Sequence, residues 1–96
     1  MPFLRYQHPG RGVVFVELGG KAVTLGRSRE CTVYLDDSML SRKHCEVRYQ
    51  GGKFVLVDLQ SKNGTHVNGL QVGTHDLREG DLISIGNVTL LFREKK

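Results

Sequence analysis

Apolar and polar residues alternate along several short stretches of this chain. The stretches cover residues 13–18, 22–25, 44–49, 53–59, 82–85 and 88–93. They are rich in Val, Ile, Phe, Tyr and Thr, and no stretch sustains a helical apolar period beyond about two turns. Many short strands with frequent turns predict an all-β fold, and more specifically a β-sandwich.

Turn-forming dipeptides separate these strands and predict three hairpins. Gly19-Gly20 would join 13–18 to 22–25, and Gly51-Gly52 would join 44–49 to 53–59. Gly86-Asn87 would join 82–85 to 88–93. Glycine and asparagine tolerate the positive φ that two-residue hairpin turns require.

The same alternation nominates a hydrophobic core. The residues predicted to face inward are Val14, Val16, Leu18, Val47, Ile83, Ile85, Leu90 and Phe92. The stretch 53–59 is apolar on both faces, so either Val55 and Val57 or Phe54 and Leu56 could point inward. A run that is apolar on both faces is typical of a central strand.

Length and composition predict one domain over residues 1–96. A chain of 96 residues can build one core but not a second. The apolar fraction is 39%, and no run approaches the ~18 apolar residues of a membrane span. The start of the chain has no signal-peptide core, so we expect a cytoplasmic location, or a nuclear one in a eukaryote.

Cysteine usage predicts two reduced thiols. Cys31 and Cys45 show neither CxxC spacing nor a disulfide-dense pattern. Cys45 shares a strand face with Val47 and Tyr49, which predicts a small buried hydrophobe rather than a nucleophile. Cys31 is expected in a loop or at a strand edge.

Three polar motifs interrupt the strands and carry the candidate chemistry. They are Gly26-Arg27-Ser28, Ser41-Arg42-Lys43-His44 and Ser61-Lys62-Asn63-Gly64-Thr65. Basic residues on loops usually form only a solvated surface, but here hydroxyl and amide groups accompany them. Together these donors suit a phosphate on a side chain, which carries about −1.5 to −2 charges. A rigid β scaffold could present all three motifs at one end.

The motifs and their order resemble the forkhead-associated (FHA) domain, a module that recognises phosphothreonine. The resemblance includes residues 25–27, 33–37, 40–44, 58–69 and 79–86, within a motif-bearing part at 21–92. It implies a β-sandwich of about eleven short, mostly antiparallel strands with the ligand loops at one end. It also implies phosphopeptide binding for signalling or assembly, without catalysis, cofactor or metal.

The resemblance assigns roles to individual residues. Phosphate contact is implied for Arg27, Ser41, Arg42 and Lys62. Contact with the peptide backbone or flanking residues is implied for Asn63, Asn68 and Met39. Structural support of the site is implied for Gly26, His44, Gly64 and Thr65. In this reading Gly26 frees a sharply bending backbone, and a ring nitrogen of His44 ties neighbouring loops together.

Some of these roles leave alternatives open. Asn68 either reaches the peptide beyond the phosphate or only shapes its own turn. Met39 is the candidate to meet a peptide side chain about three residues after the phosphothreonine, as in the family, whereas Leu40 is expected to be a small core anchor. A preference for threonine over serine follows from the resemblance and not from spacing.

Other classes of function fit this sequence less well. A nucleic-acid-binding barrel should expose aromatic residues among its basic ones, whereas Phe15, Phe54 and Phe92 lie in strand patterns. No Walker A, GxSxG or HExxH motif appears, and the adjacent His44 and Cys45 would point to opposite faces of a strand. The main alternative is a phosphate-independent scaffold or dimerisation domain on the same fold.

The expected partner is a threonine-phosphorylated protein or peptide, either separate or part of the same parent chain. We expect neither nucleic-acid binding nor membrane insertion, and we expect the domain itself to be monomeric.

Overall fold

The computed structural model describes residues 1–94, which form eleven β-strands and no helix. The strands are β1 Phe3–His8, β2 Gly12–Glu17, β3 Val23–Gly26, β4 Val33–Tyr34, β5 Cys45–Gln50, β6 Lys53–Asp58, β7 Thr65–Val67, β8 Leu70–Val72, β9 Thr74–Asp76, β10 Leu82–Ile85 and β11 Val88–Arg93. The predicted all-β fold of about eleven short strands is confirmed. Within residues 1–94, no helix has the length and apolarity needed to cross a membrane.

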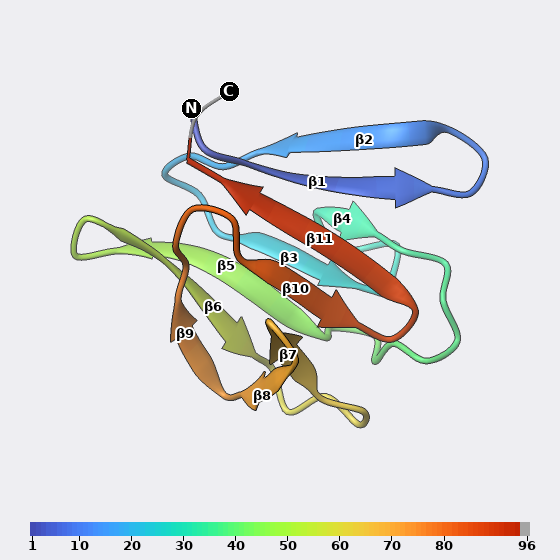
Figure 1. Ribbon diagram of the computed structural model, residues 1–96. Coiled ribbons are helices and arrows are strands. Elements are labelled where there is room, and N and C mark those ends of the chain that lie inside the picture. The colour runs from blue at the N-terminus through green and yellow to red at the C-terminus, as the bar shows by residue number, and fades with distance from the viewer. Residues whose placement is uncertain (95–96) are drawn as a thin grey trace.

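The strands form two sheets that lie face to face (Figure 1). One sheet has six strands in the order β2-β1-β11-β10-β7-β8, and the other has five in the order β4-β3-β5-β6-β9. The β3–β4 pair is parallel, and the other pairs are antiparallel. The structure therefore confirms a mostly antiparallel sandwich.

Two of the three predicted hairpins are confirmed. β5 and β6 pair with Gln50 opposite Lys53, so that Gly51 and Gly52 form a two-residue turn. Both glycines have positive φ, at 58° and 80°, as such a turn demands. β10 and β11 pair with Ile85 opposite Val88, which leaves Gly86-Asn87 as their turn.

The third predicted hairpin, between 13–18 and 22–25, is wrong. β2 pairs with β1, and β3 lies in the other sheet beside β4 and β5. Gly19-Gly20 therefore lies where the chain passes from one sheet to the other. A Gly-Gly pair suits a tight turn and a crossover equally well, and the alternation of apolar residues did not indicate β1, the true neighbour of β2.

The core fills the space between the sheets. Leu18, Val47, Ile83, Ile85, Leu90 and Phe92 are buried, as predicted, and Cys45 and Leu40 are buried with them. Val14 and Val16 are only half-buried, because β2 is an edge strand. In β6, Leu56 belongs to the core and Phe54 packs against it, whereas Val55 is buried outside this cluster. Tertiary packing thus chose between the two faces that periodicity left open.

Candidate functional site

The three polar motifs occupy three loops, which we call loop 27–32, loop 35–44 and loop 59–64. Loop 27–32 follows β3, loop 35–44 precedes β5, and loop 59–64 joins β6 to β7. Backbone hydrogen bonds join the first two: the N–H of Arg27 donates to the Ser41 carbonyl at 3.1 Å, and that of Ser28 to the Arg42 carbonyl at 3.0 Å. The predicted site residues on these loops are therefore brought together, although they lie far apart in sequence.

Gly26 permits this close approach of the loops. A Cβ atom at Gly26 would lie 2.2 Å from the Arg42 carbonyl oxygen and 3.0 Å from the His44 nitrogen. Gly26 is part of β3 and is not among the glycines with positive φ. The chain bends directly after it, at Arg27 and Ser28, and the position itself needs glycine because backbone passes directly over it.

Arg27 is exposed, and its guanidinium is held from one side. Its Nε donates a hydrogen bond of 3.1 Å to the Leu40 carbonyl in loop 35–44. This contact uses one donor of the guanidinium, so the two terminal NH₂ groups remain available for a ligand. The geometry orients Arg27 before any ligand arrives.

Ser41 and Lys62 meet at the junction of loop 35–44 and loop 59–64. The backbone N–H of Lys62 donates to Ser41 Oγ at 2.9 Å. Because the hydroxyl oxygen accepts this bond, its own hydrogen remains free to be donated. The Lys62 side chain is exposed, and so is that of Arg42, the residue after Ser41.

Asn63 and Met39 form a second bridge between the same two loops. The Asn63 side-chain nitrogen donates to the Met39 carbonyl at 2.7 Å. The Met39 N–H donates to Asp37 Oδ1 at 2.9 Å, and its side chain is 46% exposed. Asn63 therefore braces the loops already and keeps its amide oxygen as an acceptor. Its neighbour Gly64 has a φ of 88°, a conformation in which a side chain would be strained.

His44 is fully buried and connects two of the loops through its ring. The Ser41 N–H donates to His44 Nδ1 at 3.1 Å, and His44 Nε2 lies 2.9 Å from the Gly64 carbonyl oxygen. An amide N–H can only donate and a carbonyl can only accept, so the hydrogen of the ring sits on Nε2. Both ring nitrogens are therefore used internally and neither is presented to a ligand.

Asp58 is a support residue to which the sequence analysis gave no role. Its carboxylate accepts hydrogen bonds from the Ser61 N–H, from Ser61 Oγ and from Thr65 Oγ1, the last two at 2.6 Å. Burial raises the pKa of Asp58, but these hydrogen bonds outweigh it and bring the pKa below its ordinary value. An Asp followed three residues later by Ser, at a strand end, was an available turn signal.

Asp37 supports loop 35–44 and also had no predicted role. It accepts the Met39 N–H and, at 2.8 Å, the Asn87 N–H in the β10–β11 turn. The bond from Met39 is the main reason that the pKa of Asp37 is lowered. Loop 35–44 is thereby tied to the other sheet.

Cys31 lies in loop 27–32, as the sequence suggested, but it is buried. Its Sγ donates to the Arg42 carbonyl at 3.2 Å, the same oxygen that faces Gly26. Burial raises the pKa of Cys45 to about 12, which agrees with a thiol that serves packing.

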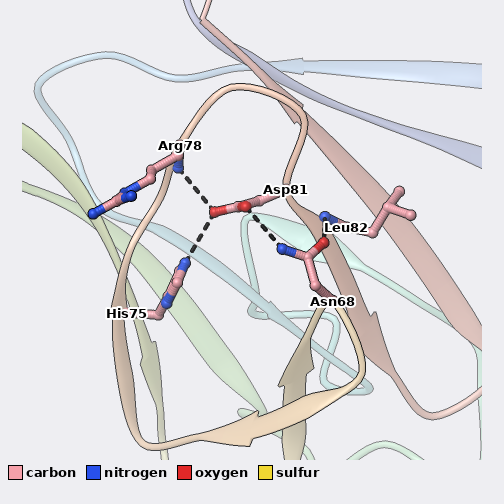
Figure 2. A network of polar contacts seen from close by, with 5 residues as sticks. All are labelled: Asn68, His75, Arg78, Asp81 and Leu82. Atoms are coloured by element: carbon pink, nitrogen blue, oxygen red, sulfur yellow. Dashed lines mark hydrogen bonds and ion pairs between the residues drawn. The ribbon is translucent and has the colours of Figure 1, made fainter.

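Asn68 lies at the far end of β7, in a network centred on Asp81 (Figure 2). Its side-chain nitrogen donates to Asp81 Oδ1, and its oxygen accepts the Leu82 N–H, both at 3.0 Å. His75 Nε2 and the Arg78 N–H contact the other oxygen of Asp81 at 2.9 Å. Both ends of the Asn68 amide are therefore occupied, which favours the alternative that it shapes its own turn.

The exposed cations of the loops are not neutralised within the described part of the chain. Across residues 1–94, no ion pair involves Arg27, Arg42, Lys43 or Lys62. A groove of about 860 Å³ is lined by Asp36, Asp37 and Ser38 of loop 35–44, but not by Arg27, Ser41 or Lys62. A ligand at the cations would therefore be held by loop tips rather than in a deep cavity.

Comparison with known proteins agrees with this arrangement. The family model for the FHA domain matches residues 23–86. The chain is 41% identical to the oxoglutarate dehydrogenase inhibitor of Corynebacterium diphtheriae over 86 residues, which is 90% of this chain and 59% of that protein. It is 39% identical to the glycogen accumulation regulator GarA of Mycolicibacterium smegmatis, over 88% of this chain and 52% of that protein. The chain thus spans between half and three fifths of these relatives.

Solved structures show the same likeness over the whole fold. A structure from a study of phosphothreonine-dependent FHA domain interactions superposes with a TM-score of 0.88 at 32% identity, covering 99% of this chain and 97% of that one. The FhaA FHA domain, in complex with the intracellular domain of Rv3910, superposes with a TM-score of 0.87 at 32% identity, covering 97% of this chain and 100% of that one. By sequence and by structure, this chain belongs to the FHA domain family.

Proposed function

We propose that this domain binds threonine-phosphorylated peptides on the loop tips that carry Arg27, Ser41 and Lys62. The observation that supports this most directly is the clustering of unpaired cations beside a serine hydroxyl that is oriented by the Lys62 N–H. A phosphate dianion would supply the negative charge and the acceptor oxygens that these groups lack.

Each group has a separate part in the proposed complex. The terminal nitrogens of Arg27 form a fork that matches two phosphate oxygens, while the Leu40 carbonyl holds Nε. The Ser41 hydroxyl donates to a third oxygen. Lys62 and Arg42 add charge from either side.

Asn63 and Met39 are proposed to contact the peptide beside the phosphate. The Asn63 amide oxygen can accept a peptide N–H while its nitrogen stays on the Met39 carbonyl. The exposed Met39 side chain offers an apolar contact to a residue that follows the phosphothreonine.

Preference for threonine is proposed by likeness to the structure described as phosphothreonine-dependent. A fitted methyl group is worth about 1 to 3 kcal/mol, so phosphoserine should bind more weakly without being fully rejected. Charged hydrogen bonds of about 1.5 to 3 kcal/mol each, less the cost of ordering the peptide, place the affinity near micromolar.

The proposed role is regulatory recruitment in the cytoplasm, without a covalent change to the partner. Two relatives are an inhibitor and a regulator by name, which supports a regulatory module. The partner is a phosphorylated protein or a phosphorylated segment of the same parent chain.

A peptide titration tests this proposal. A degenerate phosphothreonine library is titrated against the wild-type domain, with unphosphorylated and phosphoserine libraries as controls. Arg27→Ala should lower the affinity at least ~10-fold, because charge-assisted bonds to the phosphate are lost. Arg29→Ala is the matched control, since Arg29 lies over the Tyr34 ring at 5.0 Å instead. If unphosphorylated peptides bind equally well, or if no peptide binds, the phosphate-independent scaffold would be favoured.

A further inference from the structure

The two sheets have four edge strands, and one of them differs from the rest. β4 has two residues, and β8 and β9 have three each, whereas β2 has six. An edge strand presents unpaired backbone groups, and very short edges are one way in which proteins prevent further pairing. β2 is the only long edge within residues 1–94.

The middle of β2 lacks the usual protection of an edge strand, although the strand ends in the charged Glu17. Residues 13–16 read Val-Val-Phe-Val, with no charge and no proline. Phe15 is 59% exposed and Val13 is 45% exposed. Phe15 is held against Phe3 in an edge-to-face contact with 5.5 Å between ring centroids, so its position is already ordered.

Hydrogen bonding shows which backbone groups of β2 are free to pair. Just beyond the strand, the Leu18 N–H donates to the Pro2 carbonyl, in line with the β1–β2 register. In an antiparallel ladder successive residues point their N–H and C=O groups to opposite sides. Even-numbered residues of β2 therefore face β1, and the groups of Val13, Phe15 and Glu17 face the open edge.

We infer that β2 pairs antiparallel with β2 of a second copy of this chain, about a two-fold axis at Val14. This register places Val13 opposite Phe15 of the other copy, twice by symmetry, and joins their outward N–H and C=O groups. It also makes the two six-stranded sheets continuous.

Charge selects this register over its neighbours. With the axis at Val14, Gly12 lies opposite Val16 of the other copy, which brings Glu17 beside the β1–β2 turn that carries Arg11, at both ends of the pair. Arg11 and Glu17 are both exposed, and neither has an ion pair within residues 1–94. Moving the axis to Phe15 would place Val13 against Glu17, and moving it to Val13 would place Phe15 beside the turn that carries Arg11. Only the axis at Val14 places apolar side chains opposite apolar side chains and also brings opposite charges together.

The interface is a single strand, so the dimer is weak and the domain is monomeric when dilute. β2 contributes no residue to the loops described above, so both copies keep their loops free. A partner with two phosphorylated segments would then engage the dimer with a gain in avidity.

Sedimentation equilibrium of the purified chain, from ~10 µM to ~1 mM, tests the inference, because mass action populates a weak dimer at high concentration. We expect a monomer–dimer equilibrium that Phe15→Glu weakens at least ~10-fold, by placing a charge in the apolar row. Leu70→Glu is the control, since Leu70 is 72% exposed on the opposite edge strand. Circular dichroism of each variant checks that the fold is retained.

Charge exchange tests the register itself. Arg11→Glu and Glu17→Arg should each weaken self-association, and an equimolar mixture of the two variants should restore a dimer, because each then meets an opposite charge. A monomer at every concentration, or a dimer unaffected by Phe15→Glu, would overturn the inference. Failure of the mixture to restore pairing would overturn the register.

Discussion

At the scale of single residues, the three loops are held by buried or half-buried polar groups rather than by the exposed cations. His44 and Asp37 join segments that are far apart in sequence, and Asp58 closes loop 59–64 by binding Ser61 and Thr65. The groups proposed to bind phosphate remain outside this scaffold. Substitutions of the two sets should therefore give different results.

Asp58→Asn should destabilise the fold by about 2 kcal/mol, because the carboxylate accepts three hydrogen bonds that an amide cannot replace together. Chemical denaturation measures this loss, with Asp36→Asn, an exposed carboxylate, as the control. Equal stability of the two variants would show that Asp58 does not organise loop 59–64.

The same carboxylate predicts an acid-sensitive fold. The pKa of Asp58 is lowered in the folded state, and those of Asp37 and Asp81 are lowered too. Their contribution is present above the unfolded value of ~3.9 and is lost as the pH falls through the folded values. Denaturation midpoints should decline below about pH 4. In the Asp58→Asn variant the denaturation midpoint should fall less steeply with pH. An equally steep fall would contradict the contribution of Asp58 to acid sensitivity.

Gly26→Ala tests the close approach of backbone at the site. A methyl group 2.2 Å from the Arg42 carbonyl must push loop 27–32 away from loop 35–44. We expect a loss of about 1 to 3 kcal/mol in stability and a weaker response to phosphothreonine peptides. Gly20→Ala is the control, since no atom lies within 4 Å of its added Cβ. Equal effects of the two variants would refute the steric argument.

At the scale of elements, the strands that carry no motif are as necessary as those that do. β1 lies between β2 and β11 in the six-stranded sheet, and it contributes Leu4 and Tyr6 to the core. The family match begins at residue 23 and does not include it. Motifs mark the ligand loops, whereas β1 is needed for packing.

A fragment of residues 21–92 should therefore fail to fold. It would lose Leu4, Tyr6 and Leu18, which are at most 7% exposed. Each buried apolar side chain is worth about 1.5 to 3 kcal/mol, against a typical total of about 5 to 15. The dispersion of amide signals in NMR spectra of the fragment, compared with that of the full chain, shows whether the fragment is folded. A fragment with a cooperative thermal transition would contradict the prediction.

At the scale of the whole molecule, the formal net charge of +4 matters mainly through its placement. Arg27, Arg42, Lys43 and Lys62 gather on the loops without acidic partners, whereas Lys53 lies 3.3 Å from Asp76 elsewhere. The three loops carry five Lys and Arg side chains against Glu30, Asp36 and Asp37, so their net charge is positive and should draw anionic peptides to them.

Affinity for phosphothreonine peptides should accordingly fall several-fold between ~50 mM and ~500 mM salt, because salt screens exposed charges. Fluorescence anisotropy of a labelled peptide measures how steeply the affinity falls with salt concentration. Lys62→Gln should make this salt dependence less steep, and Lys53→Gln should leave it unchanged. A salt-independent affinity would argue against binding at these cations.

Much of this protein could be predicted from its sequence because the relevant signals are local. Alternation, glycine turns and the three polar motifs indicated an all-β chain of the FHA family, two of its hairpins and the residues proposed to bind phosphate. Each of these depends on neighbours within a few positions. Whether Val55 and Val57 or Phe54 and Leu56 face the core stayed open, because strand periodicity alone cannot say which face is covered.

Only the tertiary structure decided what depends on contacts between distant segments. It paired β2 with β1 instead of β3, because a glycine pair does not specify which sheet the chain enters next. It explained Gly26 by the passing carbonyl of Arg42, and it gave Asp37 its role through hydrogen bonds to Asn87 in the β10–β11 turn. It also left β2 as a long open edge. These outcomes follow from how the two sheets are laid together, which no short stretch of sequence encodes.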